Sequence, residues 1–230
     1  MATIRENLQA VKARIARAAR AAGRDPAAVR LLAVSKTHPA ERIEEARQAG
    51  QTAFGESYVQ EALRKMDALR ARRIEWHLVG PLQSNKTRAA AERFDWVHTI
   101  EREKIARRLS EQRPAALAPL QVLVQVNVSG EASKSGAAPE EVPALARAVA
   151  SLPRLRLRGL MAIPEPTPDS DLQRRRFREV RKLLESLPLD LDTLSMGMSD
   201  DLEAAIAEGS TLVRVGTGIF GAREKVRDAA

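Results

Sequence analysis

The amino-acid sequence alternates short apolar runs with longer helical patterns almost from end to end. Eight runs are apolar and short enough to be buried strands: they span residues 29–35, 52–55, 74–80, 96–99, 120–128, 155–163, 191–196 and 211–216. Helices are predicted between them, near residues 40–49, 57–71, 85–92, 101–112, 139–151, 170–186 and 200–208. Strands that alternate with helices in this way are typical of a parallel α/β sheet.

The number of strands decides between two arrangements of such a sheet. Eight strands suit a closed (β/α)8 barrel of the TIM type. Seven helices fit between the strands, and the amphipathic N-terminal segment is predicted to be an extra helix that covers the remaining gap, with one stripe formed by Ile4, Leu8, Val11 and Ile15. An open doubly wound sheet usually has a glycine-rich turn after its first strand, whereas AVSKTHP (33–39) has no glycine. We therefore predict one barrel domain over residues 1–230.

Composition narrows the classes of function. Lys and Arg total 38 against 30 Asp and Glu, and the pI near 10.4 raises the question of nucleic-acid binding. However, aromatic residues that could stack on bases make up only 3% of the chain. The densest basic run, RRRFREVRK (174–182), has apolar residues at helical spacing, which indicates a solvated helix face. No nucleic-acid partner is therefore expected.

The sequence shows no feature of a membrane or exported protein. No apolar run is long enough to span a membrane, and the N-terminus has no apolar core followed by a small-residue cleavage site. The absence of cysteine excludes disulfides and thiolate chemistry. We therefore expect a cytoplasmic protein without a membrane partner.

The first predicted strand ends in a lysine, Lys36, after the apolar run LLAV (31–34). Active residues of barrels lie at the C-terminal ends of the strands, where Lys36 is expected. Apolar neighbours disfavour the charged form of a lysine, which lowers its pKa and frees the amine as a nucleophile. The chemistry expected of such an amine is a Schiff base with an aldehyde or ketone.

The loops after the last two predicted strands are suited to a phosphate. Barrels frequently hold a phosphate in these loops, which here read SMGMSDD (195–201) and RVGTGIFG (214–221). Ser199 offers a hydroxyl and is predicted to cap the next helix. Gly216 and Gly218 allow close backbone approach, and Thr217 supplies a second hydroxyl. A Schiff-base lysine facing a phosphate site fits either a phosphorylated sugar, as in a class I aldolase, or pyridoxal 5'-phosphate (PLP). Arg214 favours PLP, because an arginine there can hydrogen-bond the pyridine nitrogen.

At these residues the chain resembles the pyridoxal phosphate homeostasis proteins (the YggS/PROSC family), whose barrel is similar to the N-terminal domain of alanine racemase. The resemblance runs from about residue 4 to 224 through five motifs in order: AVSKTHP, FGESYVQE, WHLVGPLQSNK, LSMGMSDDLEAAI and GSTLVRVGTGIFG. It implies that Lys36 carries PLP as a Schiff base. It also implies that Arg214 faces the ring nitrogen and that the phosphate is bound by Ser199, Gly216 and Thr217, with Met198 lining the same loop.

The chain departs from the family pattern at two positions. Ser57 stands where the family usually has an asparagine near the ring oxygen of the cofactor, so one hydroxyl replaces an amide. Leu78 stands where phenylalanine is usual, and we expect this change only to repack the core. His77 is expected to be a hydrogen-bonded structural residue, and no metal site is predicted.

The same residues argue against catalysis. Carbanion chemistry works best when a carboxylate holds the ring nitrogen protonated, whereas Arg214 is permanently cationic and would keep it unprotonated. Racemases with a similar barrel add a β-rich domain and a tyrosine from a partner subunit. Here only a short tail follows Phe220, and the sole tyrosine, Tyr58, is expected to pack from the second loop or helix.

We therefore predict a non-catalytic, monomeric PLP carrier that buffers free PLP and has apo PLP-dependent enzymes as recipients. The resemblance implies the same role. Two enzymatic alternatives remain open at this point, a single-domain PLP-dependent amino-acid racemase and a class I aldolase-like Schiff-base enzyme.

Overall fold

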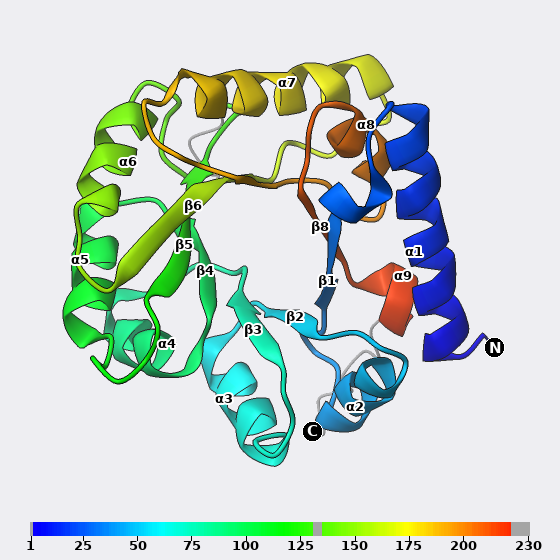
Figure 1. The fold of residues 1–230 in the computed structure, drawn as a ribbon, viewed down its shortest axis with the longest axis horizontal. Helices are drawn as coiled ribbons and strands as arrows, with labels where there is room; N and C mark the ends of the chain where they lie inside the picture. Colours follow the sequence, from blue (N-terminus) through cyan, green and yellow to red (C-terminus); the bar gives the residue numbers. More distant parts are fainter. Residues whose placement is uncertain (1, 131–134, 222–230) are drawn as a thin grey trace, which may run out of the picture.

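The computed structural model describes residues 2–130 and 135–221, so Met1 and the tail beyond Gly221 lie outside the described residues. Within them, eight parallel strands close into a barrel in the order of the sequence (Figure 1). The strands are β1 (Arg30–Val34), β2 (Ala53–Glu56), β3 (Glu75–Leu78), β4 (Trp96–Ile100), β5 (Leu120–Val126), β6 (Leu155–Ala162), β7 (Thr193–Ser195) and β8 (Leu212–Val215). The predicted (β/α)8 barrel is confirmed.

Helices surround the barrel and follow the predicted order. The predicted ones are α1 (Ile4–Ala21), α2 (Ala40–Gln48), α3 (Val59–Ala68), α4 (Thr87–Arg93), α5 (Glu103–Gln112), α6 (Val142–Ala150), α7 (Ser170–Ser186) and α8 (Leu202–Ala207). The predicted helix 85–92 begins with a 3-10 turn, η2 (Ser84–Lys86), before α4. Two short elements were not predicted, the 3-10 turn η1 (Pro26–Ala28) and the helix α9 (Thr217–Phe220). A single helical turn is too short to produce a periodic apolar pattern, which explains the omission.

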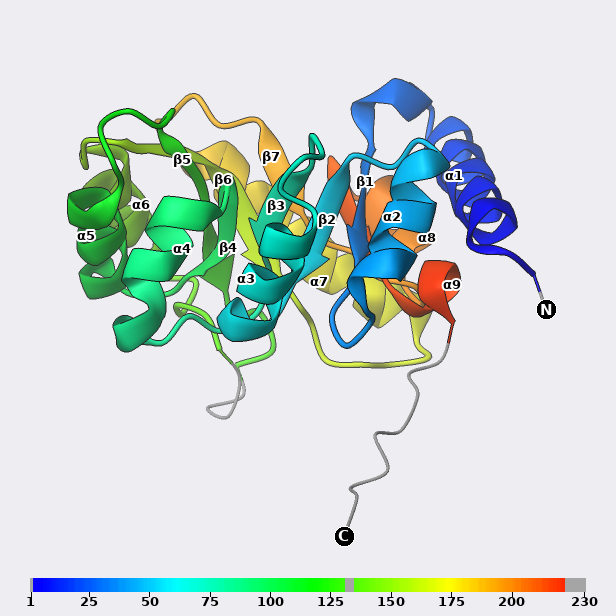
Figure 2. The same cartoon turned by 90° about the horizontal axis from the view of Figure 1, so that it is seen from below.

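Helix α1 covers the gap between the last and first strands, as predicted. Thr3 begins it with a capping box, in which its hydroxyl accepts from the Glu6 N–H and the Glu6 carboxylate accepts from the Thr3 N–H. The stripe expected from the sequence is buried, and α1 packs against α2, α8 and α9 (Figures 1 and 2). The helix therefore closes the outer ring beside β8 and β1.

The core lies between the strands and the helices, and the strands are apolar because both of their faces are buried. Phe54 and Leu78 of neighbouring strands are fully buried, as are Leu120 and Val124 of β5. Burying one such side chain stabilises the fold by about 1.5–3 kcal/mol. Leu78, one of the two departures from the family pattern, is therefore an ordinary core residue.

The basic run of α7 is held by acidic residues of the same chain. Phe177 is buried under the helix, while Arg174 and Arg178 donate to the buried carboxylate of Glu208. Arg176 donates to Glu165 in the same way. These arginines form intramolecular ion pairs on a half-exposed helix face. In the described part of the chain, no helix has the length and apolar character needed to cross a membrane.

Candidate functional site

A cleft of about 580 Å³ opens at the C-terminal ends of the strands. It contains every cofactor residue predicted from the sequence, although these residues come from opposite ends of the chain. Its lining is Arg14, Val34, Lys36, His38, Ser57, Val79, Ile163, Met198, Ser199, Asp200, Arg214, Gly216, Thr217 and Gly218. The closed barrel explains the convergence, because it places the end of β8 next to the end of β1.

Lys36 lies in the turn after β1, and a buried ion cluster holds the residue on each side of it. Lys65 of α3 donates from Nζ to the carbonyl oxygen of Ser35 (2.9 Å) and to the carboxylates of Glu56 (2.8 Å) and Glu61 (2.6 Å). The Ser35 hydroxyl donates to Glu56, and the Thr37 N–H donates to Glu61, both at 2.6 Å.

This cluster stabilises a turn that would otherwise be strained. Thr37 has a φ of +66°, a left-handed conformation that is rare for a β-branched residue. The Lys65 side chain is 7% exposed and that of Glu56 is fully buried. Burial raises the pKa of Glu56 above its usual value, and the charge of Lys65 offsets only part of this rise. The Oε2 atom of Glu56 is buried without a hydrogen-bond partner among the described residues, so the carboxylate depends on the bonds that Lys65 and Ser35 donate to Oε1.

Ser57 lies directly after β2 and lines the cleft. The loop after β3 packs against its backbone at Gly80, where a Cβ atom would come within 2.2 Å of the Ser57 carbonyl oxygen. Only glycine fits at this position, which explains why the WHLVGPLQSNK motif contains one. Tyr58, the next residue after Ser57, lies in the second loop at the start of α3, as expected, but it is 59% exposed, so the expectation that it packs was wrong.

Arg214 points from β8 into the base of the cleft and is held by three acceptors. Its Nη1 donates to the carbonyl oxygen (2.6 Å) and the hydroxyl (2.7 Å) of Ser195, and its Nη2 donates to the Ala162 carbonyl oxygen (2.9 Å). Burial lowers the pKa of Arg214 to about 10, which leaves the guanidinium charged at neutral pH.

The loop after β7 corrects the prediction for Ser199. The N-cap of α8 is Asp201, whereas Ser199 lies two residues earlier and lines the cleft. The Asp201 carboxylate accepts from the Met198 N–H (2.5 Å) and so folds the loop back on itself before the helix begins. The first Ser, Thr, Asp or Asn before an apolar run is a common cap, but here the SDD sequence offered three candidates and the last one was used.

The loop after β8 meets the loop after β7. Gly216 lies so close to the end of β1 that a Cβ atom there would be 3.0 Å from the Val34 carbonyl oxygen. A Cβ atom on Gly218 would lie 3.9 Å from the Ser199 hydroxyl oxygen. Thr217 begins α9 between these two glycines. Two hydroxyls and a closely packed glycine backbone therefore converge on one side of the cleft.

Arg14 and His38 also line the cleft, and neither was predicted from the sequence. Arg14 of α1 donates to the Ser199 carbonyl oxygen (2.7 Å) and to both carboxylate oxygens of Glu203. His38 stacks on Phe220 of α9, with 5.1 Å between the ring centroids. The sequence around His38 (KTHP, 36–39) contains no cluster of residues at metal-ligand spacing. Arg14 lies on the polar face of an amphipathic helix, where an arginine is ordinary.

Comparison with known proteins gives the family. The model of the alanine racemase N-terminal domain matches residues 7–224. A pyridoxal phosphate homeostasis protein of Pseudomonas aeruginosa is 64% identical over 224 residues and covers 97% of each chain. This chain belongs to the pyridoxal phosphate homeostasis protein family. The family resemblance predicted from the five motifs is thereby confirmed.

Solved structures extend the comparison. PipY of Synechococcus elongatus, a structure with PLP bound, is 36% identical, has a TM-score of 0.84 and covers 95% of this chain and 100% of its own. An alanine racemase of Clostridium difficile is 14% identical, with a TM-score of 0.73, and the match covers 97% of this chain and 58% of the racemase. The second likeness shows the shared barrel fold alone.

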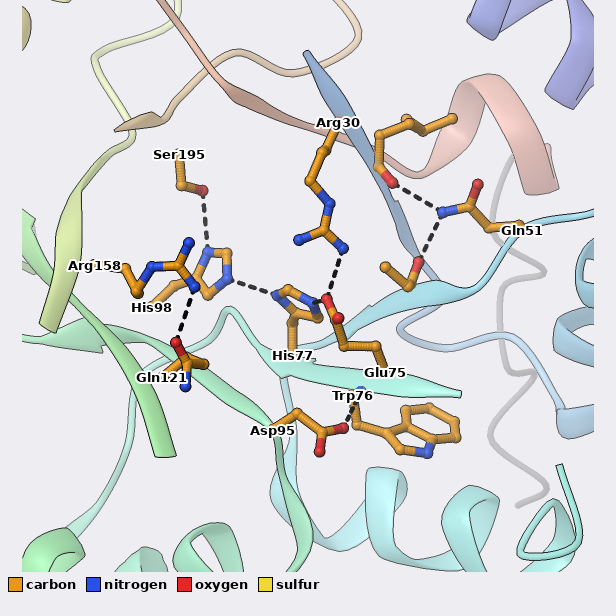
Figure 3. Close-up of polar contacts among 12 residues, drawn as sticks. Arg30, Gln51, Glu75, Trp76, His77, Asp95, His98, Gln121, Arg158 and Ser195 are labelled. Atoms are coloured by element: carbon orange, nitrogen blue, oxygen red, sulfur yellow. Dashed lines mark hydrogen bonds and ion pairs between the residues drawn. The ribbon is translucent and has the colours of Figure 1, made fainter. Parts of the chain in front are cut away.

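The predicted structural histidine of the family motif WHLVGPLQSNK is confirmed as hydrogen-bonded. His77 is fully buried and contacts Glu75 and His98 through its two ring nitrogens (Figure 3). It does not line the cleft. In the described residues, no group of three or more His, Cys, Asp or Glu side chains is placed to hold a metal ion.

Proposed function

We propose that this protein binds PLP in the cleft, with Lys36 forming a Schiff base to the cofactor aldehyde. The observation that carries the proposal is the convergence of Lys36, Arg214 and the two hydroxyl-bearing loops on one cleft. The proposal is further supported by membership of the homeostasis family and by PipY, a relative with PLP bound.

The donor set of the cleft fits the cofactor. Lys36 supplies an amine for the aldehyde, with loss of one water when the imine forms. Arg214 supplies N–H donors and positive charge for the ring nitrogen. Ser199, Gly216 and Thr217 supply hydroxyls and close backbone approach for the phosphate, with Met198 on the same loop and Ser57 on the opposite side.

We further propose that the protein carries or buffers PLP without catalysing a reaction on it. Bound PLP supplies enzymes with an electron sink, which is strongest when its ring nitrogen is protonated. A permanently cationic Arg214, held by three neutral acceptors, keeps the proton off that nitrogen. The predicted single domain over residues 1–230, the cytoplasmic location, the monomeric state and the apo-enzyme recipients stay predictions.

Covalent trapping tests the binding proposal. Purified protein incubated with PLP and then reduced with borohydride is expected to gain one pyridoxyl group, located on Lys36 by peptide mass. The Lys36→Ala variant is expected to gain none, whereas Lys86→Ala, a lysine outside the cleft, should label like the wild type. Wild-type protein that gains no mass contradicts the proposal.

Activity assays on the loaded protein test the carrier proposal. We expect it to reactivate an apo PLP-dependent enzyme and to leave amino acids unchanged. Turnover of an amino acid at enzymatic rates identifies a racemase instead. Trapping of a phosphorylated sugar on Lys36, without PLP uptake, identifies an aldolase-like enzyme.

A further inference from the structure

A chain of polar side chains crosses the barrel interior from Arg214 in the cleft to the opposite end. Figure 3 shows its part from Ser195 to Arg30. We call it the polar relay, and its members in order are Arg214, Ser195, His98, His77, Glu75 and Arg30. The Ser195 hydroxyl oxygen lies 2.7 Å from Arg214 Nη1 and 3.0 Å from His98 Nδ1. His98 Nε2 lies 2.9 Å from His77 Nδ1. His77 Nε2 lies 2.6 Å from the Glu75 carboxylate, which also accepts from Arg30 (2.8 Å).

Arg214 and Glu75 fix the direction of the hydrogen bonds between them in the polar relay. Arg214 can only donate, and an ionised Glu75 can only accept. Burial acts to raise the pKa of Glu75, but the hydrogen bonds from His77 and Arg30 and the positive charge of Arg30 lower it to about 2. The Ser195 hydroxyl therefore donates to His98, His98 donates from Nε2 to His77, and His77 donates from Nε2 to Glu75. Burial lowers the pKa of both histidines, in agreement with two neutral rings.

The histidines lie in a part of the barrel that excludes water. Both are fully buried, and His77 stacks on Trp96 with 5.2 Å between the centroids and 8° between the planes. Trp96 packs in turn with Leu123 and Met161. Barrel interiors are usually filled by bulky apolar residues, so a polar layer is stable only when its groups are hydrogen-bonded. Here each ring nitrogen has a partner, and low polarity strengthens every bond of the relay.

We propose that Ser195, His98 and His77 are positioning residues, through which Glu75 at one end of the barrel orients Arg214 at the other. A serine hydroxyl that donates to His98 is a stronger acceptor for Arg214, because hydrogen bonds in a chain polarise one another. The relay thereby fixes how Arg214 presents its remaining N–H groups to the cleft. This proposal rests on the proposed PLP site, in which Arg214 faces the ring nitrogen.

The first test needs no cofactor. Nitrogen NMR of the histidine rings in the cofactor-free protein should show His77 and His98 neutral, each with its proton on Nε2. Removing the acceptor with Glu75→Leu should shift the ring nitrogen signals of His98, which lies two hydrogen bonds away from Glu75 in the relay. Glu75→Gln retains an acceptor oxygen and should shift them less. Protons on Nδ1, charged rings, or a His98 signal that is unchanged in Glu75→Leu overturn the proposal.

The second test measures coupling to the cleft. PLP binding should shift the His77 ring signals in the wild type and not in Ser195→Ala, which cuts the relay. Ser195→Ala and Glu75→Leu should each weaken PLP binding by about 2- to 10-fold, the worth of one neutral hydrogen bond. In the double variant the Glu75→Leu effect should disappear, because the relay is already cut. Effects that multiply in the double variant overturn the proposal.

The two proposals fail in different ways. If the wild type takes up no PLP, the proposed function fails, while the tautomers of the cofactor-free protein still decide whether the relay exists. Circular dichroism checks that Ser195→Ala is folded. If it is not, Glu75→Leu alone decides, because Glu75 lies at the partly exposed end of the relay and its effect is read at the buried His98.

Discussion

Lys36 and Arg214 face the same cleft but are held by different kinds of interaction. The turn that contains Lys36 is held by ionised side chains, because Lys65 pairs with the carboxylates of Glu56 and Glu61. These carboxylates accept hydrogen bonds from Ser35 and Thr37, the residues on either side of Lys36. Arg214 is held by neutral groups, two carbonyls and the Ser195 hydroxyl. Removing one member of a buried ion cluster leaves an uncompensated charge, whereas removing one neutral bond costs far less. The lysine side of the cleft is therefore tied to the stability of the fold, and the arginine side can be altered with the fold intact.

The largest expected effect breaks the ionic side. Lys65→Met leaves Glu56 and Glu61 buried or half-buried without their cation and should reduce the free energy of unfolding by about 3–5 kcal/mol. Urea denaturation followed by circular dichroism measures this loss. Lys182→Met, at an exposed lysine of α7, is the matched control and should change little. A loss below about 1 kcal/mol for Lys65→Met would show that the ion cluster stabilises the fold no more than a surface ion pair does.

The next largest effect concerns backbone packing at two glycines of the cleft loops. Gly80→Ala drives a Cβ atom into the Ser57 carbonyl, with no flexible side chain to move, and should cost about 1–3 kcal/mol. Gly216→Ala, on the arginine side, meets the Val34 carbonyl at 3.0 Å and should cost less. The two melting temperatures give the comparison directly. The reverse order would show that the turn after β8 is the less tolerant of the two.

Acid should act on the far end of the polar relay. Folding lowers the pKa of Glu75 from 4.5 to about 2, so its contribution is complete above pH 4.5 and is lost as the pH falls towards 2. Because its side chain is 35% exposed, this contribution should not exceed about 1 kcal/mol. The fall in the urea midpoint from pH 7 to pH 3 should therefore be smaller in Glu75→Gln than in the wild type. An equal fall in both proteins contradicts the lowered pKa.

The smallest expected effect concerns the loop of Ser199. Arg14→Met removes a half-exposed ion pair with Glu203 and a bond to the Ser199 carbonyl, at a cost of about 0.2–1 kcal/mol. Glu203→Gln removes the charge pair but leaves the bond from Arg14 to Ser199. PLP binding, measured by absorbance titration, should therefore weaken more in Arg14→Met than in Glu203→Gln. Equal affinities would mean that Arg14 does not position this loop for the cofactor.

The strands and the cleft could be predicted from local patterns. The eight apolar runs became β1 to β8, because a strand buried on both faces is recognisable without knowledge of its partners. Lys36, Ser199 and Gly216 were found because barrels bring the C-terminal ends of their strands together. The cap of α8 was missed, since three capping residues in a row give the same local signal.

The sequence by itself determined the order of the strands and of the longer helices, the barrel, and the predicted cofactor residues of the cleft, although not Arg14 and His38 beside them. Only the tertiary structure decided what holds them. Lys65 reaches Ser35 across 30 positions, and His98 reaches Ser195 across 97. Such contacts depend on the register of strands and on which side chains face the interior, neither of which leaves a periodic trace along the chain. The residues proposed to bind the cofactor can therefore be recognised in the sequence. The contacts of the ion cluster and of the buried histidines form only when the barrel closes.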